Sequence, residues 1–92
     1  MRRLVLVSGP GAPASAELVS PVTVGRGPEC TLVIPDARIS RQHCVVEERG
    51  GQYFLIDTSS NGTRINGRLI KESQLKDGDR ILLAAGVELA LE

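Results

Sequence analysis

Glycine and proline divide this chain into short segments, which strongly limits what it can fold into. The 92 residues include 10 Gly and 5 Pro, and no window of a dozen residues shows helical periodicity without one of them. Between these breaks lie short runs rich in Val, Leu and Ile, some of which alternate apolar and polar positions as half-buried strands do. The pattern predicts a loop over residues 8–15. It predicts strands at 4–7, 22–24, 31–34, 43–47, 53–57, 63–65, 68–70, 80–83 and 87–91.

The connections between these runs carry turn sequences typical of antiparallel strands. Asn66-Gly67 is the best two-residue hairpin turn in the chain, because both positions tolerate positive φ. Arg49-Gly50-Gly51 is a second hairpin turn. Many short strands with frequent turns predict an all-β antiparallel sandwich or barrel. Loops gather at the two ends of such sheets, so segments far apart in the sequence can form one site.

Length and composition narrow the possible functions. The chain is long enough for one domain with one core, over residues 1–92. Its formal net charge is zero, with 11 basic and 11 acidic residues, which gives no broad basic surface for nucleic acid. Tyr53 and Phe54 are the only aromatic residues, too few for stacking on single strands. No nucleic-acid partner is expected.

Cysteine, histidine and hydropathy exclude further classes. Cys30 and Cys44 are too few and too far apart for a disulfide framework or a zinc knuckle, and we expect two buried thiols. With one histidine, they make no convincing metal site, and no cofactor is expected. The apolar run 4–7 falls short of the roughly 7–15 residues of a signal peptide. No apolar run approaches the ~20 residues of a membrane span. We expect no membrane insertion, and a cytoplasmic protein or a part of a larger cytoplasmic chain.

Three polar segments follow apolar runs, where strands would give way to loops. They are Gly25-Arg26, Ser40-Arg41-Gln42-His43 and Ser60-Asn61-Gly62-Thr63. Together they offer two guanidinium groups, three hydroxyls and two side-chain amides, with no carboxylate. Arginine supplies planar, permanently charged forks that match phosphate oxygens, and hydroxyls and amides add neutral donors. If the fold gathers them, these segments suit a doubly charged anion carried on an extended peptide.

Each segment also has a plainer interpretation. Gly25-Arg26 alone would be a turn followed by a solvated arginine. Residues 40–43 could be an ordinary loop, and Asn61-Gly62-Thr63 a turn; its form as a glycosylation acceptor has little weight without a secretory signal. Ser40, His43 and Asp57 could suggest a hydrolase, but no glycine-rich nucleophile elbow surrounds Ser40. No enzyme activity is therefore expected.

The order Gly-Arg, Ser-x-x-His, Asn-Gly-Thr-x-x-Asn-Gly resembles the forkhead-associated (FHA) domain, a phosphothreonine-recognition module. The resemblance covers essentially the whole chain. Its matching segments are 22–26, 39–43, 57–67 and 75–81, each weak alone but specific in this order and spacing. The resemblance implies a β-sandwich of about eleven short strands, with peptide bound by the loops at one end.

The resemblance also implies a role for individual residues. The phosphate contacts would be Arg26, Ser40 and Arg41. The peptide contacts would be Ser60 and Asn61, with Arg64 as a further candidate. Residues that shape or tie the loops would be Gly25, His43, Gly62 and Thr63. Two positions depart from the family pattern: Gly27 stands where a serine is frequent, and Thr31 where an acidic or amide residue is common.

The implied function is non-catalytic binding of a phosphothreonine-bearing protein or peptide, downstream of a Ser/Thr protein kinase. The alternative is an FHA fold used for phosphate-independent interaction or oligomerisation. The intact set of Arg26, Ser40 and Asn61 argues against this alternative, because a site released from phosphate recognition need not keep all three.

Overall fold

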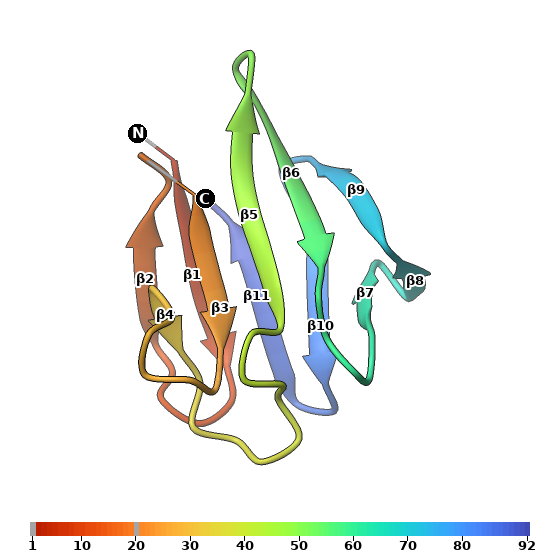
Figure 1. The fold of residues 1–92 in the computed structure, drawn as a ribbon. Coiled ribbons are helices and arrows are strands. Elements are labelled where there is room, and N and C mark those ends of the chain that lie inside the picture. Colours follow the sequence, from red (N-terminus) through yellow and green to blue (C-terminus); the bar gives the residue numbers. More distant parts are fainter. Residues whose placement is uncertain (1, 20) are drawn as a thin grey trace.

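The computed structural model describes residues 2–19 and 21–92, which contain eleven strands and no helix. The strands form two sheets that pack face to face (Figure 1). Their bounds are β1 (Arg3–Ser8), β2 (Ala14–Glu17), β3 (Val22–Gly25), β4 (Leu32–Val33), β5 (Cys44–Arg49), β6 (Gln52–Asp57), β7 (Thr63–Ile65), β8 (Arg68–Ile70), β9 (Glu72–Leu75), β10 (Arg80–Ala84) and β11 (Val87–Leu91). The predicted all-β sandwich is confirmed.

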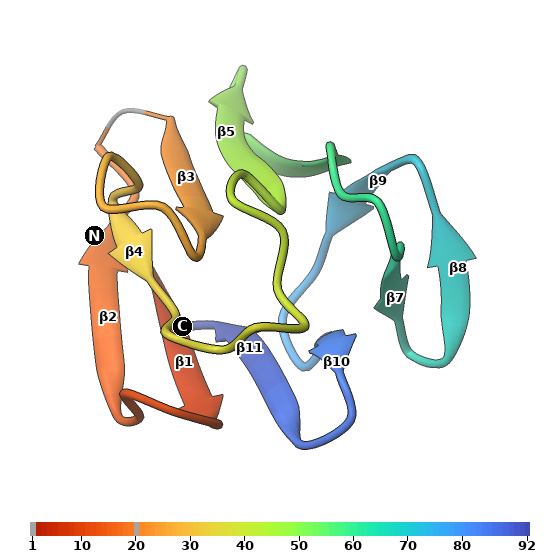
Figure 2. The same ribbon diagram turned by 60° about the horizontal axis from the view of Figure 1, so that its bottom comes forward.

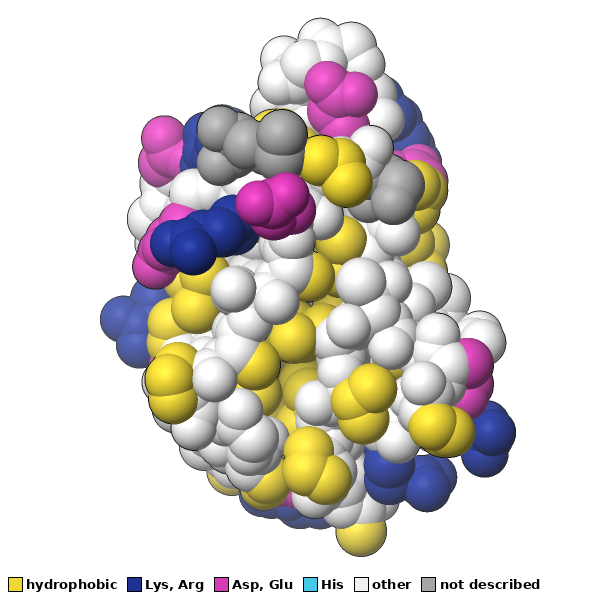
Figure 3. All heavy atoms as spheres, turned by 90° about the vertical axis from the view of Figure 1, so that its left-hand side faces the viewer, with side chains coloured by type: hydrophobic (Ala, Val, Ile, Leu, Met, Phe, Trp, Pro, Cys, Tyr) yellow, Lys and Arg dark blue, Asp and Glu magenta, His cyan; other side chains and the backbone are white. Residues whose placement is uncertain are grey.

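One sheet has six strands in the order β2-β1-β11-β10-β7-β8, and the other has five in the order β4-β3-β5-β6-β9. The pairs with a defined register are antiparallel except β3–β4, which is parallel. β8 and β9 each end a sheet, at the same side of the sandwich, and β2 and β4 end the sheets at the other side. On the β2–β4 side apolar side chains reach the surface (Figure 3), and Val33 is 41% exposed there.

The core follows the alternation of the strands. In β3, Val22 and Val24 are buried while Thr23 between them is partly exposed. Burying one such aliphatic side chain is worth about 1.5–3 kcal/mol. Cys44 is fully buried and Cys30 nearly so, both as free thiols, which confirms that expectation. The most deeply buried apolar residues are Leu4, Leu6, Val22, Val24, Ile34, Ile39, Cys44, Val46, Leu55, Ile81, Val87 and Leu89.

The predicted loop over 8–15 is wrong at its end, because β2 begins at Ala14 and pairs with β1. Alanine has low strand propensity, but pairing with a neighbour outweighs it here. β9 was not predicted, since only Leu75 of its four residues is buried. It forms by pairing with β6. The other predicted strands are present, with ends that differ by at most two residues.

The loops that carry the three polar segments gather at one end of the sandwich, opposite the end with the β5–β6 turn (Figures 1 and 2). Segments 26–31, 34–43 and 58–62 join β3 to β4, β4 to β5 and β6 to β7, and the β10–β11 turn lies at the same end. Arg3 and the last residue, Glu92, lie together at the opposite end, where they exchange two backbone hydrogen bonds. The described residues hold no helix that could cross a membrane.

Candidate functional site

The β3–β4 and β4–β5 loops are joined by backbone hydrogen bonds. The Arg26 N–H donates to the Ser40 carbonyl and the Gly27 N–H donates to the Arg41 carbonyl, both at 3.0 Å. Gly25 is required at this junction, because a Cβ on it would lie 2.3 Å from the Arg41 carbonyl oxygen. The first two polar segments of the sequence therefore meet as one rigid unit.

His43 joins this unit to the β6–β7 loop. Its buried ring accepts a hydrogen bond at Nδ1 from the Ser40 backbone N–H, at 3.1 Å. Nε2 therefore carries the proton and donates to the Gly62 carbonyl oxygen, also at 3.1 Å. Burial lowers the pKa of His43, although the bond to Gly62 and the charge of Asp57 oppose that effect. The ring is neutral and ties the second polar segment to the third.

The β6–β7 loop is organised around the carboxylate of Asp57, for which the sequence suggested no role of its own. Asp57 Oδ1 accepts bonds from the Ser59 N–H, the Ser59 hydroxyl and the buried Thr63 hydroxyl, at 3.1, 2.6 and 2.9 Å. The Ser59 Oγ accepts in turn from the Gly62 N–H at 2.7 Å. Burial would raise the pKa of Asp57, but these donors outweigh burial and lower it. A serine two residues after an aspartate is the sequence pattern of such a turn.

The three polar segments meet at one hollow of about 260 Å³. Five of the six residues predicted to bind phosphate or peptide line it, namely Arg26, Ser40, Arg41, Ser60 and Asn61. Arg64 does not; it lines an adjoining hollow of about 330 Å³ together with Asn61 and Arg38. Gly25, His43 and Thr63 are buried behind the hollow, while Gly62 is half-buried and lines the adjoining hollow with Asn61.

Ser40 is oriented as a donor toward this hollow. Its Oγ accepts a hydrogen bond from the Ser60 backbone N–H at 3.0 Å, which leaves its own proton available. Asn61 is exposed and donates through Nδ2 to the Arg38 carbonyl at 3.3 Å, which keeps its amide at the rim. A hydroxyl proton and an amide thus face a common space.

The arginines around the hollow differ in how far they are neutralised. Arg41 is paired with Glu29, with Nε and Nη2 at 3.1 and 3.3 Å from the two carboxylate oxygens. Arg38, which the sequence interpretation overlooked, is paired with Asp36 at 2.7 Å and lowers the pKa of that carboxyl to about 2. Arg26 has no ion pair among the described residues.

Among the described residues, the Arg26 side chain makes a single hydrogen bond. Its Nε donates to the Ile39 carbonyl at 3.1 Å, so both terminal nitrogens remain available for a ligand. Among the described residues no group of three or more His, Cys, Asp or Glu side chains suits a metal ion. The site therefore presents one free guanidinium, one hydroxyl proton and one amide, which is a donor set for an oxyanion.

Comparison with known proteins identifies the family. A family model for the FHA domain matches residues 22–84. The chain belongs to the FHA domain family. It is 32% identical over 80 residues to the glycogen accumulation regulator GarA of Mycolicibacterium smegmatis, a match that covers 85% of this chain and 51% of GarA. The chain spans about half of that relative, and 12% of two other curated relatives.

Solved FHA domains share the whole fold. The FHA domain of FhaA, solved in complex with the intracellular domain of another protein, is 31% identical, with a TM-score of 0.87 and all of both chains covered. The MEK1 FHA domain, solved in complex with a HOP1 phosphothreonine peptide, is 29% identical, with a TM-score of 0.81 and coverage of 98% of this chain and 93% of that one.

The two departures of this FHA domain from the family pattern have structural explanations. A Cβ on Gly27 would lie 2.5 Å from the Glu29 carboxylate, so the missing side chain makes room for the partner of Arg41. The Thr31 hydroxyl oxygen accepts a hydrogen bond from the Thr23 backbone N–H at 3.4 Å, and the Thr31 N–H donates to the Thr23 hydroxyl oxygen at 3.0 Å, so the pair pins the β3–β4 loop to β3. Neither departure disturbs Arg26 or Ser40.

Proposed function

We propose that this FHA domain is a non-catalytic module that binds a phosphothreonine-bearing protein segment produced by a Ser/Thr protein kinase. The observation that carries the proposal is the free guanidinium end of Arg26, which lines the same hollow as the Ser40 hydroxyl. A phosphothreonine brings about −1.5 to −2 charges and three acceptor oxygens. Because such kinases use intracellular ATP, the proposed location is the cytoplasm.

The roles of the individual residues follow from their positions. Arg26 and Ser40 donate to the phosphate oxygens, and Arg41 adds a contact from its remaining N–H groups. Asn61 and Ser60 line the same hollow, where they bind the main chain beside the phosphothreonine. Arg64 extends the peptide-binding surface into the adjoining hollow. Gly25, His43, Gly62 and Thr63 hold the loops.

The geometry of His43 supports a non-catalytic role. Both of its ring nitrogens are engaged by backbone groups, Nδ1 by the Ser40 N–H and Nε2 by the Gly62 carbonyl. The ring therefore has no free nitrogen to accept a proton from the Ser40 hydroxyl, as a general base would have to do. A serine–histidine nucleophile pair is absent from this arrangement of the described residues.

The test is a titration with matched peptides that carry phosphothreonine, phosphoserine or unmodified threonine. We expect binding only with phosphate, and weakening of about tenfold or more in the Arg26→Ala variant, because one charge-assisted contact is worth about 1.5–3 kcal/mol. Arg80→Ala is a matched control, since Arg80 is also exposed but pairs with Glu88 away from the hollow. Equal binding of phosphorylated and unmodified peptide would support the alternative, a phosphate-independent interaction surface.

A further inference from the structure

The charges of this neutral chain are unevenly distributed over its surface. Six of the 11 Lys and Arg side chains form ion pairs within the part of the chain that the structure describes. The other five form none there. They are Arg26, Arg64, Arg68, Lys71 and Lys76. The first lies in a binding loop, the next two lie in β7 and β8, and the two lysines flank β9.

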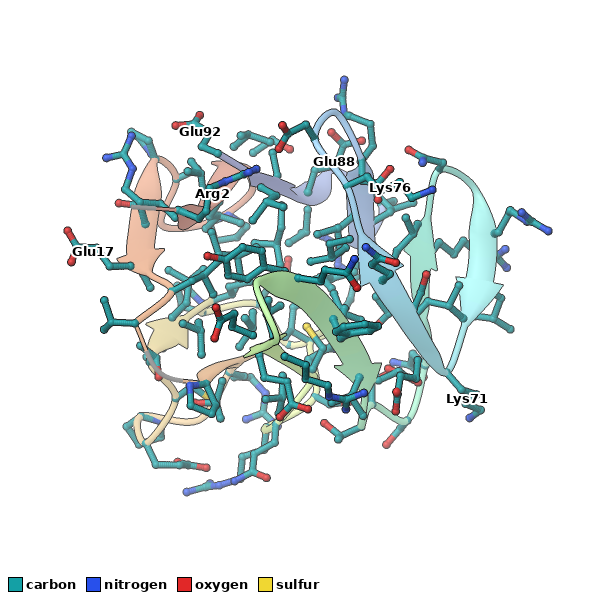
Figure 4. The ribbon with its side chains drawn as sticks, turned by 90° about the horizontal axis from the view of Figure 1, so that it is seen from above. Arg2, Glu17, Lys71, Lys76, Glu88 and Glu92 are labelled. Atoms are coloured by element: carbon teal, nitrogen blue, oxygen red, sulfur yellow. The ribbon has the colours of Figure 1, made fainter. Side chains whose placement is uncertain are left out.

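The last three of these cations line a groove between the edge strands β8 and β9. This hollow of about 720 Å³ is lined by Arg68, Lys71 and Lys76 and by the apolar Leu69 and Ile70, and we call it the β8–β9 groove. Figure 4 shows Lys71 and Lys76 at opposite ends of β9, while Glu17 lies on the far side of the molecule. The groove is thus a cationic surface.

The acidic side chains in the groove are already engaged by the protein. Glu72 accepts a hydrogen bond from Arg49 Nη1 at 2.8 Å. Asp79 accepts from the Asn66 side-chain amide at 2.9 Å and from the Lys76 backbone N–H at 2.8 Å. The cations of the groove have no such partners among the described residues, so their charges are available to a ligand.

The β8–β9 groove is continuous with the candidate site. Leu69, Ile70 and Lys71 also line a second hollow of about 260 Å³, whose other wall includes Ser60 and Asn61. Those two residues line the hollow that holds Arg26 and Ser40. Leu69 is 61% exposed at the midpoint of this path, so its apolar side chain is accessible to a ligand that crosses from one hollow to the other.

We propose that the β8–β9 groove binds an acidic segment of the same protein whose phosphothreonine occupies the hollow at Arg26. The inference rests on the proposed function, because it takes the phosphothreonine as the anchor. The acidic side chains contact Arg68, Lys71 and Lys76, and an apolar side chain between anchor and acidic segment packs on Leu69. Binding in the groove adds affinity to the anchor because the second contact is made within one bound molecule.

The dimensions of the molecule set the spacing in such a ligand. The sandwich measures 34 × 24 × 20 Å, and an extended chain advances about 3.3 Å per residue. About seven extended residues therefore span the 24 Å dimension of the sandwich. The acidic segment is expected roughly that far from the phosphothreonine, beyond the immediate neighbours that contact the loops.

Nucleic acid is the other polyanion that a cationic groove could attract. Recognition of single strands uses aromatic side chains on which the bases stack. The only aromatic residues, Tyr53 and Phe54, belong to β6 and do not line the groove. An acidic peptide, whose carboxylates need only cations and backbone donors, fits these residues better.

The experiment compares a short phosphothreonine peptide with two long ones, which carry three glutamates about seven residues before or after the phosphothreonine. Each long peptide has a counterpart with serines in place of the glutamates. The proteins are the wild type, Arg68→Ala/Lys76→Ala, and the control Arg3→Ala/Arg80→Ala, which also removes two exposed positive charges. Circular dichroism and thermal unfolding check the fold of each, and affinities come from calorimetry.

We expect one long acidic peptide to bind the wild type about fivefold to tenfold more tightly than its serine counterpart, since exposed ion pairs each add only modestly to affinity. The gain should disappear in Arg68→Ala/Lys76→Ala, persist in the control variant, and shrink as salt concentration rises. The short peptide should bind all three proteins equally.

Other outcomes would overturn the inference in separate ways. If the short phosphopeptide binds but neither long acidic peptide gains affinity, the groove proposal fails while the proposed function stands. If no phosphopeptide binds, the proposed function itself fails. A single-stranded oligonucleotide that binds more tightly than the long acidic peptide, and loses affinity in Arg68→Ala/Lys76→Ala, would assign the groove to nucleic acid instead.

Discussion

The ring of His43 donates a hydrogen bond through Nε2 to the carbonyl oxygen of Gly62, 19 residues away, at 3.1 Å. Through Nδ1 the same ring accepts the N–H of Ser40. This contact connects the loop that carries the Ser40 hydroxyl to the loop that carries Asn61. The relative position of these two binding groups thus depends on one neutral imidazole.

Protonation of His43 should therefore destabilise the domain. Because its pKa is lowered in the folded state, the unfolded chain binds more protons below its own pKa of about 6.5, and the free energy of unfolding falls as pH drops below that value. Above about pH 7 this contribution is constant. Denaturant unfolding between pH 7.5 and 5 measures the free energy of unfolding, and the decrease due to His43 should be absent in His43→Gln. An unchanged decrease in that variant would assign the pH dependence to other groups.

Gly25→Ala should destabilise the junction of the β3–β4 and β4–β5 loops. The new Cβ would meet the Arg41 carbonyl oxygen at 2.3 Å, so the backbone must move, at a cost of about 1–3 kcal/mol. Gly50→Ala is a useful comparison, because its Cβ would meet nothing and its φ of +60° costs only about 1 kcal/mol. Thermal unfolding of both variants tests the difference. Equal losses would mean that the loop junction relaxes freely.

Asp57→Ala should weaken both stability and peptide binding. The substitution leaves the hydroxyl of Ser59 and the buried hydroxyl of Thr63 without their acceptor, a loss of about 1–3 kcal/mol in the free energy of unfolding.

The stabilisation by Asp57 also depends on pH. Since the folded-state pKa of Asp57 is lowered, its contribution to the free energy of unfolding is present above the unfolded pKa of about 3.9 and is lost as pH falls through the folded value. Glu48→Gln, an exposed site outside the loop, is the control. A normal affinity for phosphopeptide would show that Asn61 does not need this loop conformation.

Glu29→Gln should increase the affinity for phosphopeptide about threefold, because the Arg41 guanidinium is then no longer neutralised by a carboxylate. The difference from the wild type should be largest at low salt and small at high salt, as for any exposed charge. Calorimetric titration at two salt concentrations measures it. A lower affinity would mean that Glu29 acts mainly by orienting Arg41.

Much of the fold follows from local sequence pattern. The alternation in 22–24 and the turn at Asn66-Gly67 predict strands and a hairpin because pleat and turn depend on adjacent residues. β2 and β9 could not be predicted in this way. Their sequences, with Ala14 and Ala16 in one and only Leu75 buried in the other, become strands through pairing with β1 and β6.

The candidate site likewise has a part that the sequence predicted and a part that only the folded structure reveals. The sequence identified the three polar segments, and the hollow brings together Arg26, Ser40, Arg41, Ser60 and Asn61. The sequence suggested no role for Arg38 and did not reveal that Glu29 pairs with Arg41, since an ion pair depends on which side chains the loops place within reach.

By itself, then, the sequence determined the all-β class, the positions of its loops and the residue types that suit a phosphate, because these depend on short-range pattern and on chemistry that each side chain keeps anywhere. The tertiary structure alone decided which charges are neutralised and which remain free. Within residues 2–19 and 21–92 it left Arg26 without an ion pair at the loops, and Arg68, Lys71 and Lys76 without one at the β8–β9 groove. Pairing depends on which neighbours the packing of the two sheets brings within reach.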